Sequence, residues 1–567
     1  VYKIYCSVIN ERLSRWVEEN DKVTDEQNGF RRKRSTIDHV SSLTSLIETR
    51  KKLKKSTFCA FIDFKKAYDS INREKLWQRL SEIGVSGKLF KTIRSLYSSV
   101  TSCVRVNSMH TDWFDVKCGL RQGCILSPIL FNLYINDLVL YLKSFGKGVK
   151  CNDDYICTLL YADDVVLLAE TEQDLQVLLE ALNGWCLSNN MTVNVNKSNI
   201  VHFRNPTVKK TDCIFKCGNN ILKIVDSYTY LGVFLTEHLD FELTAKSVAQ
   251  SASRALGLLI AKYKLAGGLP YNVYTKLYES VVCPVIDYSA SIWGFKSYSC
   301  INAVQNRAMR VFLGVGKYTP TTALHGELGW EPCISRQWSC IGRHVVRMSC
   351  TNSSRLNKRI ALWASDNASQ QCRNWFFVFA KRCKELNLNF DANISRPISK
   401  ILVKSLHSAI LQEYKANWFT SINSKVGPSG RGNNKLRTYC QFKSVYEVEQ
   451  YCKMILPLRH RAAFAKFRCG VAPLRIETGR FENKPLEERK CPFCNAIESE
   501  SHTLLTCNLY TDLRSELFLK AQAVNEEFIS FSTENKLIFL FSNHNMIRLC
   551  AKTCFNILQR RAFYLCK

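Results

Sequence analysis

The sequence lacks the long hydrophobic run that a membrane-spanning helix needs, and it lacks an N-terminal secretory signal. The most apolar long stretch, residues 125–142, contains Asn132, Asn136 and Asp137. These polar side chains would be costly to place in lipid, and no uninterrupted run of about 20 apolar residues exists. The chain begins at Val1 and soon reaches charged residues instead of an apolar segment. We therefore predict no membrane partner.

Acidic residues are also in short supply. The chain has 49 Asp and Glu against 79 Lys and Arg, which gives a formal net charge of +30 and a pI of about 9.3. A positive field of this size attracts polyanions. Nucleic acid is the first candidate partner and an anionic membrane surface the second, while the simplest alternative is that the basic residues are only solvated.

Internal repeats and long low-complexity segments are missing as well. With 567 residues, 46% hydrophobic and 23% charged, the chain fits a folded protein of three or four domains. Because it does not begin with Met, we interpret it as a fragment or an excised domain.

The 26 cysteines are scattered, mostly within apolar runs, which predicts buried free thiols in a reducing compartment. One cluster near the C-terminus departs from that pattern.

Local patterns predict a mixed α and β chain. The apolar run TFCAFIDF at 57–64 predicts a buried strand, and TLLYADDVVLLAE at 158–170 predicts a hairpin with two acids at its tip. From about residue 240 onward the pattern is helical and becomes basic. The remaining predictions are two helices within 1–55, helices at 71–81 and 120–142, strands at 191–203 and 223–235, and a break at 427–434.

Three carboxylates stand at the ends of these predicted strands. Asp63 ends the first strand, and Asp163 and Asp164 occupy the hairpin tip. Ionised carboxylates in apolar runs need a partner, and adjacent like charges raise each other's pKa. A pair of Mg²⁺ ions would satisfy all three acids and could clamp the attacking and leaving oxygens of a phosphoryl transfer. The alternative is a pair of ordinary turn acids beside an unrelated strand-end Asp.

A second cluster has the spacing of a zinc site. Cys491, Cys494, His502 and Cys507 form a C-x₂-C-x₇-H-x₄-C pattern. Three thiolates and one imidazole suit a closed tetrahedral Zn²⁺ site of structural type. The alternative is that these are ordinary thiols in a cysteine-rich chain.

Several segments resemble the motifs of a known family. FIDFKKAYD at 61–69, GLRQGCILSPILFNLYIND at 119–137 and YADD at 161–164 are similar to three successive palm motifs of reverse transcriptases. QNGFRRKRSTIDHV at 27–40 resembles a fingers motif of LINE and group II intron enzymes. NVNKSNIVHF and YLGVFL resemble the lysine-bearing strand and the primer-grip hairpin, and the 491–507 cluster resembles the zinc segment of LINE proteins. Together they resemble a non-LTR (LINE-type) retrotransposon reverse transcriptase that is truncated at its N-terminus.

The resemblance implies an α+β right-hand polymerase with an antiparallel palm sheet. Fingers and palm would span residues 1–236 and the thumb 237–345. A mostly helical, basic C-terminal domain with a small zinc site would follow at 346–567. Residues 281–294 and 323–330 resemble parts of the family's thumb, and their aromatic and aliphatic residues at helical spacing are typical of core packing. The helix at 301–313 would either pack in the core or follow duplex phosphates.

The resemblance also implies roles for single residues. Asp63 and Asp163 would be metal ligands and Asp164 the third acid of the Mg²⁺ site, with unequal roles because neighbouring strand residues face opposite ways. Tyr68 would be a gate that excludes a ribose 2′-hydroxyl, or else plain core packing. The other implied nucleotide contacts are Phe64 through its backbone, Gln122, Gly123, Lys197, Arg31 and Arg34, although the three basic residues could instead be solvated.

The activity implied by this family is RNA-directed DNA polymerisation by target-primed reverse transcription. Its partners would be template RNA, primer or target DNA and dNTPs, with two Mg²⁺ ions and one structural Zn²⁺. The site of action would be nuclear, with a cytoplasmic ribonucleoprotein stage. Two other hypotheses stay open: a catalytically silent nucleic-acid-binding remnant or domesticated protein, and a group II intron maturase. No nuclease-like acidic motif follows the zinc cluster, and the sequence leaves the oligomeric state undetermined.

Overall fold

The computed structural model describes residues 2–424 and 435–565, and the break predicted at 427–434 lies outside them. The chain divides into two compact units. The first comprises residues 1–244, 291–293 and 342–402, and the second comprises 245–290, 294–341 and 403–567. The compact units divide the chain differently from the three predicted domains, since residues 342–402 belong with the N-terminal region.

The first unit is built on one six-stranded sheet with the order β11-β12-β10-β1-β9-β8. Most neighbouring strands are antiparallel, as predicted, but β10 and β12 run parallel, so the expectation of a wholly antiparallel sheet is wrong at this pair. Short two-stranded ladders complete the β-structure of the described residues. The sheet strands are β1 (Thr57–Ile62), β8 (Thr158–Tyr161), β9 (Asp164–Ala169), β10 (Asn199–Phe203), β11 (Phe215–Cys217) and β12 (Asn220–Ile224); the ladders are β2 (Thr101–Ser102) with β5 (Phe114–Asp115), β3 (Arg105–Val106) with β4 (Met109–His110), β6 (Val149–Cys151) with β7 (Asp154–Ile156), and β13 (Ser227–Tyr230) with β14 (Val233–Thr236).

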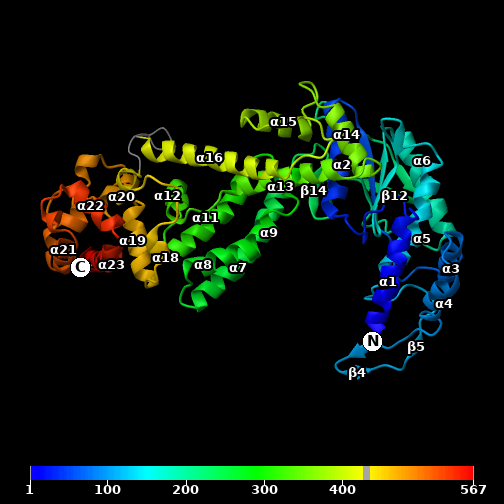
Figure 1. Ribbon diagram of the computed structural model, residues 1–567, viewed down its shortest axis with the longest axis horizontal. Coiled ribbons are helices and arrows are strands. Elements are labelled where there is room, and N and C mark those ends of the chain that lie inside the picture. Colours follow the sequence, from blue (N-terminus) through cyan, green and yellow to red (C-terminus); the bar gives the residue numbers. More distant parts are fainter. Residues whose placement is uncertain (1, 425–434, 566–567) are drawn as a thin grey trace. The chain divides into compact units, whose positions relative to one another are not determined.

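Helices cover both faces of this sheet. The predicted helix at 120–142 begins only at Ser127, with Pro128 in its first turn where its missing N–H costs nothing. Figure 1 shows α5 and α6 on one side of the sheet and α2 and α14 on the other. The helices of this unit are α1 (Tyr2–Glu19), α2 (Thr36–Lys52), α3 (Arg73–Glu82), α4 (Gly87–Ser95), α5 (Ser127–Lys143), α6 (Glu172–Ser188), α14 (Leu356–Asp366) and α15 (Trp375–Glu385).

The central strand β1 explains why its sequence is apolar at every position. Phe58, Ala60 and Ile62 pack into the core beneath α5 and α6. Cys59 and Phe61 point the other way, into the core beneath α2 and α14. A strand buried on both faces reads as a continuous hydrophobic run instead of an alternating one.

The strand register brings the predicted acids to one edge of the sheet. Ile62 lies opposite Val165 in the antiparallel β1–β9 pair, so Asp63 follows β1 beside the start of β9. In the β8–β9 hairpin Tyr161 pairs with Asp164, which leaves Ala162 and Asp163 as the two-residue turn. The turn therefore holds one acid, and the second opens the returning strand.

The described residues of the second unit contain helices and no strand. Their longer elements include α7 (Glu242–Leu265) and α16 (Ile401–Asn423), whose first residues belong to the first unit, and α13 (Cys333–Cys350), which contributes to both. Among the described residues, no helix is long and apolar enough to cross a membrane. The other helices are α8 (Tyr271–Leu277), η1 (Tyr278–Val282), α9 (Cys283–Ile286), α11 (Ser299–Leu313), α12 (Thr321–Leu328), α17 (Tyr439–Phe442), α18 (Gln450–Lys453), α19 (Leu458–Arg468), α20 (Arg475–Phe481), η2 (Leu486–Glu488), η3 (His502–Thr506), η4 (Asn508–Tyr510), α21 (Thr511–Val524), η5 (Glu526–Ile529), α22 (Thr533–Ser542) and α23 (His544–Leu565), with α10 (Ala290–Trp293) spanning the boundary at 290.

Candidate functional site

A pocket of about 830 Å³ opens where β1 ends. It is lined by six of the residues that the sequence singled out, drawn from four separate segments of the chain. Those residues are Asp63, Phe64, Tyr68, Gln122, Asp163 and Lys197, and the rest of the lining is Lys65, Lys66, Ala67, Asp69, Ser70 and Asn194. Residues that are distant in the sequence thus converge on one cavity that is rich in charge.

Asp63 is held in place by the loop that precedes β10. The Asn194 side-chain amide donates to Asp63 Oδ2 over 2.8 Å, and the Asn194 N–H donates to the Asp63 carbonyl over 2.7 Å. The Asp63 N–H in turn donates to Ser198 Oγ over 3.1 Å. Both the backbone and one carboxylate oxygen of Asp63 are therefore fixed before any ligand arrives.

The three acids influence one another electrostatically. Burial raises the pKa of Asp163, and the nearby Asp63 charge raises it further. Burial also raises the pKa of Asp164 to about 6, with added contributions from Asp163 and Asp63. Two half-buried carboxylates with raised pKa values beside a third acid are a donor set that a hard divalent cation stabilises. Asp164 opens strand β9 and lies outside the pocket lining, so it and Asp163 do not have equal positions.

The sequence of this unit is similar to that of known proteins. Residues 1–235 match the family described as reverse transcriptase (RNA-dependent DNA polymerase). Among curated proteins, a "Probable RNA-directed DNA polymerase from transposon BS" of Drosophila melanogaster is 25% identical over 61% of this chain and 38% of its own length. The RNA-directed DNA polymerase from the mobile element jockey of the same fly is 22% identical over 65% of this chain and 41% of its own length.

Residues 1–235 form a reverse transcriptase domain. A Pol polyprotein from the retrotransposable element R2 of Popillia japonica is also similar, at 26% identity over 37% of this chain and 30% of its own length. The chain thus spans about two fifths of the first two relatives, which are longer proteins. Among solved structures, apo telomerase from Candida tropicalis aligns with 72% of this chain and 61% of its own, at 11% identity and a TM-score of 0.34.

Tyr68 forms a rigid wall of the pocket in this reverse transcriptase domain. Its ring stacks on Phe131 with centroids 4.7 Å apart and an interplanar angle of 14°. Its hydroxyl is buried without a hydrogen-bond partner, and burial together with the Asp163 charge raises the pKa of Tyr68 to about 12. The ring is thus held by packing, and its hydroxyl stays protonated.

Gln122 and Gly123 have different surroundings. The Gln122 side-chain amide donates to Asp69 Oδ1 over 2.9 Å, which anchors it at the pocket wall. Gly123 adopts a left-handed backbone with φ of +77°, a conformation that favours glycine, and it lies outside the pocket lining.

Arg31 and Arg34 are not brought into the pocket. Arg31 makes a bidentate ion pair with Glu18, at 2.7 and 2.8 Å, and is buried. Arg34 Nη1 lies 2.5 Å from Asp25 Oδ1, and Arg34 also donates to Asn28 Oδ1. Burial lowers the pKa of Arg34 to about 10. Both guanidinium groups therefore stabilise the loop that follows α1 of the reverse transcriptase domain.

Among the site residues that sequence reasoning passed over are two lysines, a glutamine and a glycine. Lys65 and Lys66 line the pocket directly. Gln27 and Gly29 contact the turn that carries Asp163. All four lie inside the quoted motifs, but those motifs direct attention to the acids and arginines. They give no signal for a side chain such as that of Gln27, which hydrogen-bonds to backbone atoms.

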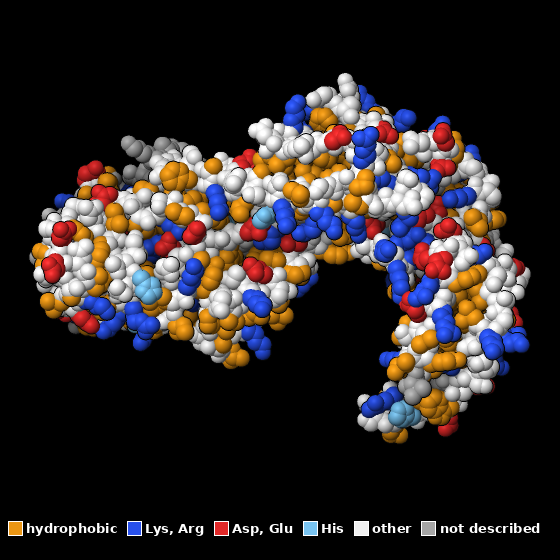
Figure 2. Space-filling view, in the orientation of Figure 1, with side chains coloured by type: hydrophobic (Ala, Val, Ile, Leu, Met, Phe, Trp, Pro, Cys, Tyr) orange, Lys and Arg blue, Asp and Glu red, His pale blue; other side chains and the backbone are white. Residues whose placement is uncertain are grey.

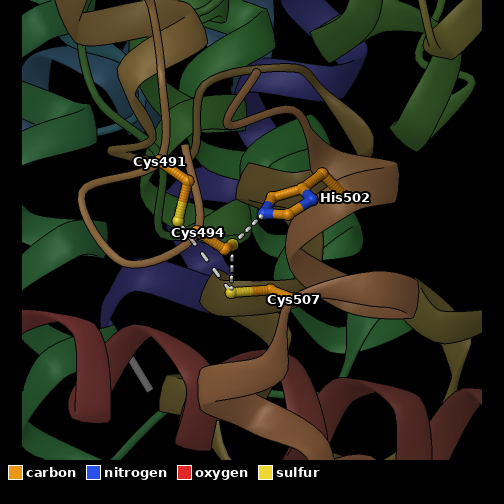
Figure 3. Close-up of side chains that lie close together, drawn as sticks. All are labelled: Cys491, Cys494, His502 and Cys507. Carbon is orange, nitrogen blue, oxygen red and sulfur yellow. Dashed lines mark hydrogen bonds between the residues drawn. The ribbon is translucent and has the colours of Figure 1, made fainter. Parts of the chain in front are cut away.

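The Cys and His cluster forms a separate site in the second compact unit. The four ligand atoms of Cys491, Cys494, His502 and Cys507 all lie within 4.8 Å of one another, the one such group of three or more found among the described residues (Figure 3). Cys494 Sγ is 3.5 Å from Cys507 Sγ and 3.1 Å from His502 Nε2, and Cys491 Sγ is 3.9 Å from Cys507 Sγ. Tetrahedral ligands of one zinc would lie about 3.6–3.8 Å apart, so the observed spacing is close to that of a zinc site.

Surrounding contacts orient these ligands. The second ring nitrogen of His502, Nδ1, lies 3.1 Å from Thr506 Oγ1, which leaves Nε2 directed at the thiols. Arg514 donates to the Cys507 carbonyl. Such outer contacts, which fix the ring orientation of a ligating His, are typical of metal sites.

Proposed function

We propose that this chain is an RNA-directed DNA polymerase of a non-LTR retrotransposon, acting by target-primed reverse transcription. The observation that carries the proposal is the convergence of Asp63, just after β1, and Asp163, in the β8–β9 turn, on the pocket of a reverse transcriptase domain. On this proposal the sheet of the first unit would be the palm of a right-hand polymerase, and the thumb would follow at residues 237–345.

The reaction joins a deoxynucleotide to a primer. The primer 3′-oxygen attacks the α-phosphorus of a dNTP, a new phosphodiester bond forms, the bond to the β-phosphate oxygen breaks, and pyrophosphate leaves while the hydroxyl proton is lost. A Mg²⁺ pair held by Asp63 and Asp163, with Asp164 as the third acid, would activate the 3′-hydroxyl and neutralise the phosphates. The chain itself supplies position and charge, because little covalent chemistry falls to the protein in phosphoryl transfer.

Other pocket residues support dNTP binding. Lys65, Lys66 and Lys197 line the same cavity as the acids and would neutralise the triphosphate. The stacked ring of Tyr68 would meet a ribose 2′-hydroxyl, which favours deoxynucleotides. Phe64 would offer its backbone groups to the same ligand, and Gln122 would border the incoming base.

The charge of the molecule fits template RNA and primer DNA as partners. The net charge is +30, and Figure 2 shows Lys and Arg side chains spread over the face in view. Such a field attracts nucleic acid and keeps it close during repeated additions. Action in the nucleus after a cytoplasmic ribonucleoprotein stage is part of this proposal.

The four-residue cluster would hold one structural Zn²⁺. Its ligands are three thiols and one imidazole, a set that closes a tetrahedral shell and leaves no open position for substrate. The adjoining Glu498 is fully buried and makes a bidentate ion pair with Arg561 of α23, at 2.7 and 2.8 Å. The metal would therefore stabilise the contact between this loop and the last helix.

Primer extension tests the proposed activity. Purified protein is given an RNA template, an annealed DNA primer, Mg²⁺ and dNTPs, beside an Asp163→Ala variant. We expect incorporation by the native chain and none by the variant. Incorporation that survives the substitution would refute the metal assignment, and binding of RNA without incorporation by the native chain would favour a silent nucleic-acid-binding protein.

A further inference from the structure

A loop at residues 26–29 caps the edge of the sheet beside the turn that carries Asp163. Strand β8 is the edge strand, and Gln27 forms a parallel bridge with Leu160 in it. The Asn28 N–H donates to the Leu160 carbonyl over 2.9 Å, and the Leu160 N–H donates back to the loop over 2.9 Å. The loop thus adds one isolated bridge to the edge of the sheet.

The Gln27 side chain continues this pairing beyond the end of β8. Its amide NH₂ donates to the Ala162 carbonyl over 3.1 Å, and the Ala162 N–H donates to its Oε1 over 2.8 Å. The same Oε1 accepts the Gly29 N–H over 2.8 Å, which fixes the orientation of the amide. Gln27 is fully buried, so these bonds do not exchange with water.

Ala162 needs such support because its backbone is strained. It adopts φ of +58°, a left-handed conformation that is unfavourable for a non-glycine residue. The backbone of Gly29 packs closely against the same residue, since a Cβ on Gly29 would lie 2.2 Å from the Ala162 nitrogen. Because Ala162 directly precedes Asp163, a small rotation at Ala162 moves the carboxylate.

We propose that Gln27 is a positioning residue for DNA synthesis, which sets the place of the Asp163 carboxylate by holding both polar backbone atoms of Ala162. This inference rests on the proposed polymerase function. Gln27 touches neither substrate nor metal in this role, and it acts through the turn alone. Strained backbone that its surroundings hold in place is common where geometry serves function.

The test replaces Gln27 by Met, which keeps the length of the side chain and removes its three hydrogen bonds. Two quantities are measured: kcat and KM in primer extension, and Mn²⁺ binding followed by the electron paramagnetic resonance signal of free Mn²⁺. We expect kcat to fall about 10- to 100-fold, since a displacement near 1 Å is enough for such a loss. The half-saturating Mn²⁺ concentration rises several-fold, while KM for dNTP changes little.

The chain supplies a matched control in Gln176. Its side-chain amide donates to the Lys216 carbonyl over 3.0 Å and accepts the Lys216 N–H over 2.9 Å, the same pair of bonds at the opposite edge of the sheet. Gln176→Met therefore removes a similar contact from the same sheet. We expect this variant to keep the native kcat and Mn²⁺ affinity.

The outcomes are distinguishable. A folded Gln27→Met protein with native kcat and native Mn²⁺ binding overturns the proposal, as does an equal loss in Gln176→Met. If Gln27→Met fails to fold, Gln27→Asn replaces it, because Asn keeps an uncharged amide but is one carbon too short to hold both polar atoms of Ala162; the same decisions then apply. If the native chain does not extend a primer, the polymerase function fails, and the Mn²⁺ comparison still decides whether Gln27 sets the turn.

Discussion

Tyr68 illustrates how a single side chain can fix the size of a substrate pocket. Its ring is stacked on Phe131 and its hydroxyl has no partner, so selectivity should come from the ring and not from a hydrogen bond. We expect Tyr68→Ala to raise the ratio of rNTP to dNTP kcat/KM at least about 10-fold, because one lost steric contact is worth about 1–3 kcal/mol. Tyr68→Phe should leave this ratio unchanged. A ratio that moves equally in both variants would contradict the ring as the gate.

Buried histidines make the first compact unit sensitive to acid. Burial, assisted by the positive charge of Arg347, lowers the pKa of His344 to about 3, and its Nε2 lies 2.8 Å from Ser41 Oγ. Burial alone lowers the pKa of His39 to about 3. The unfolded chain binds protons at these groups below pH 6.5 and the folded chain does not. Stability is therefore complete above pH 6.5 and falls as the pH drops toward 3.

At pH 5 each of these histidines should lower the free energy of unfolding by about 2 kcal/mol relative to pH 7.5. We expect His344→Gln to reduce this pH dependence by about that amount, measured by urea unfolding at both pH values. His110→Gln, at an exposed position, is the control and should change nothing. Equal pH dependence in native protein and His344→Gln would show that this ring does not stay neutral in the folded state.

At the scale of elements, the Cys and His loop is predicted to depend on its metal. Cys494→Ser removes one of the four ligands, so we expect about one equivalent of zinc to be lost in metal analysis and the melting temperature to fall. A chelator should lower the melting temperature of the native chain and leave that of the variant unchanged. Cys440→Ser, outside the cluster, serves as the control. Unchanged zinc content in Cys494→Ser would remove the site.

Elements with strong local patterns were predictable, and contacts between elements were not. β1 and the β8–β9 hairpin follow from apolar runs that end in acids, and their pairing brought Asp63 beside Asp163 as the motifs required. The fates of Arg31 and Arg34 were not visible, because their partners Glu18 and Asp25 become neighbours only after the chain folds. The support from Gln27 was missed for the same reason, since a side chain bonded to distant backbone atoms leaves no periodic signal.

For the whole molecule, the net charge of +30 predicts binding of nucleic acid that depends strongly on salt. Each phosphate that is neutralised releases counterions, so affinity for an RNA–DNA hybrid should fall at least about 100-fold between 50 and 200 mM salt. Fluorescence anisotropy with a labelled hybrid measures this slope. A nearly flat dependence on salt would show that the basic residues are solvated and do not contact phosphates.

The most direct test of the central claim asks whether Asp63 and Asp163 act as one unit. Single-turnover nucleotide incorporation is measured for the native chain, Asp63→Asn, Asp163→Asn and the double variant. The losses of activity caused by substituting two residues that hold the same metal ions do not add. We therefore predict that each single variant loses nearly all activity and that the double variant is no slower than the slower single variant. Losses that multiply in the double variant, or a single variant that keeps the native rate, would contradict a shared metal site.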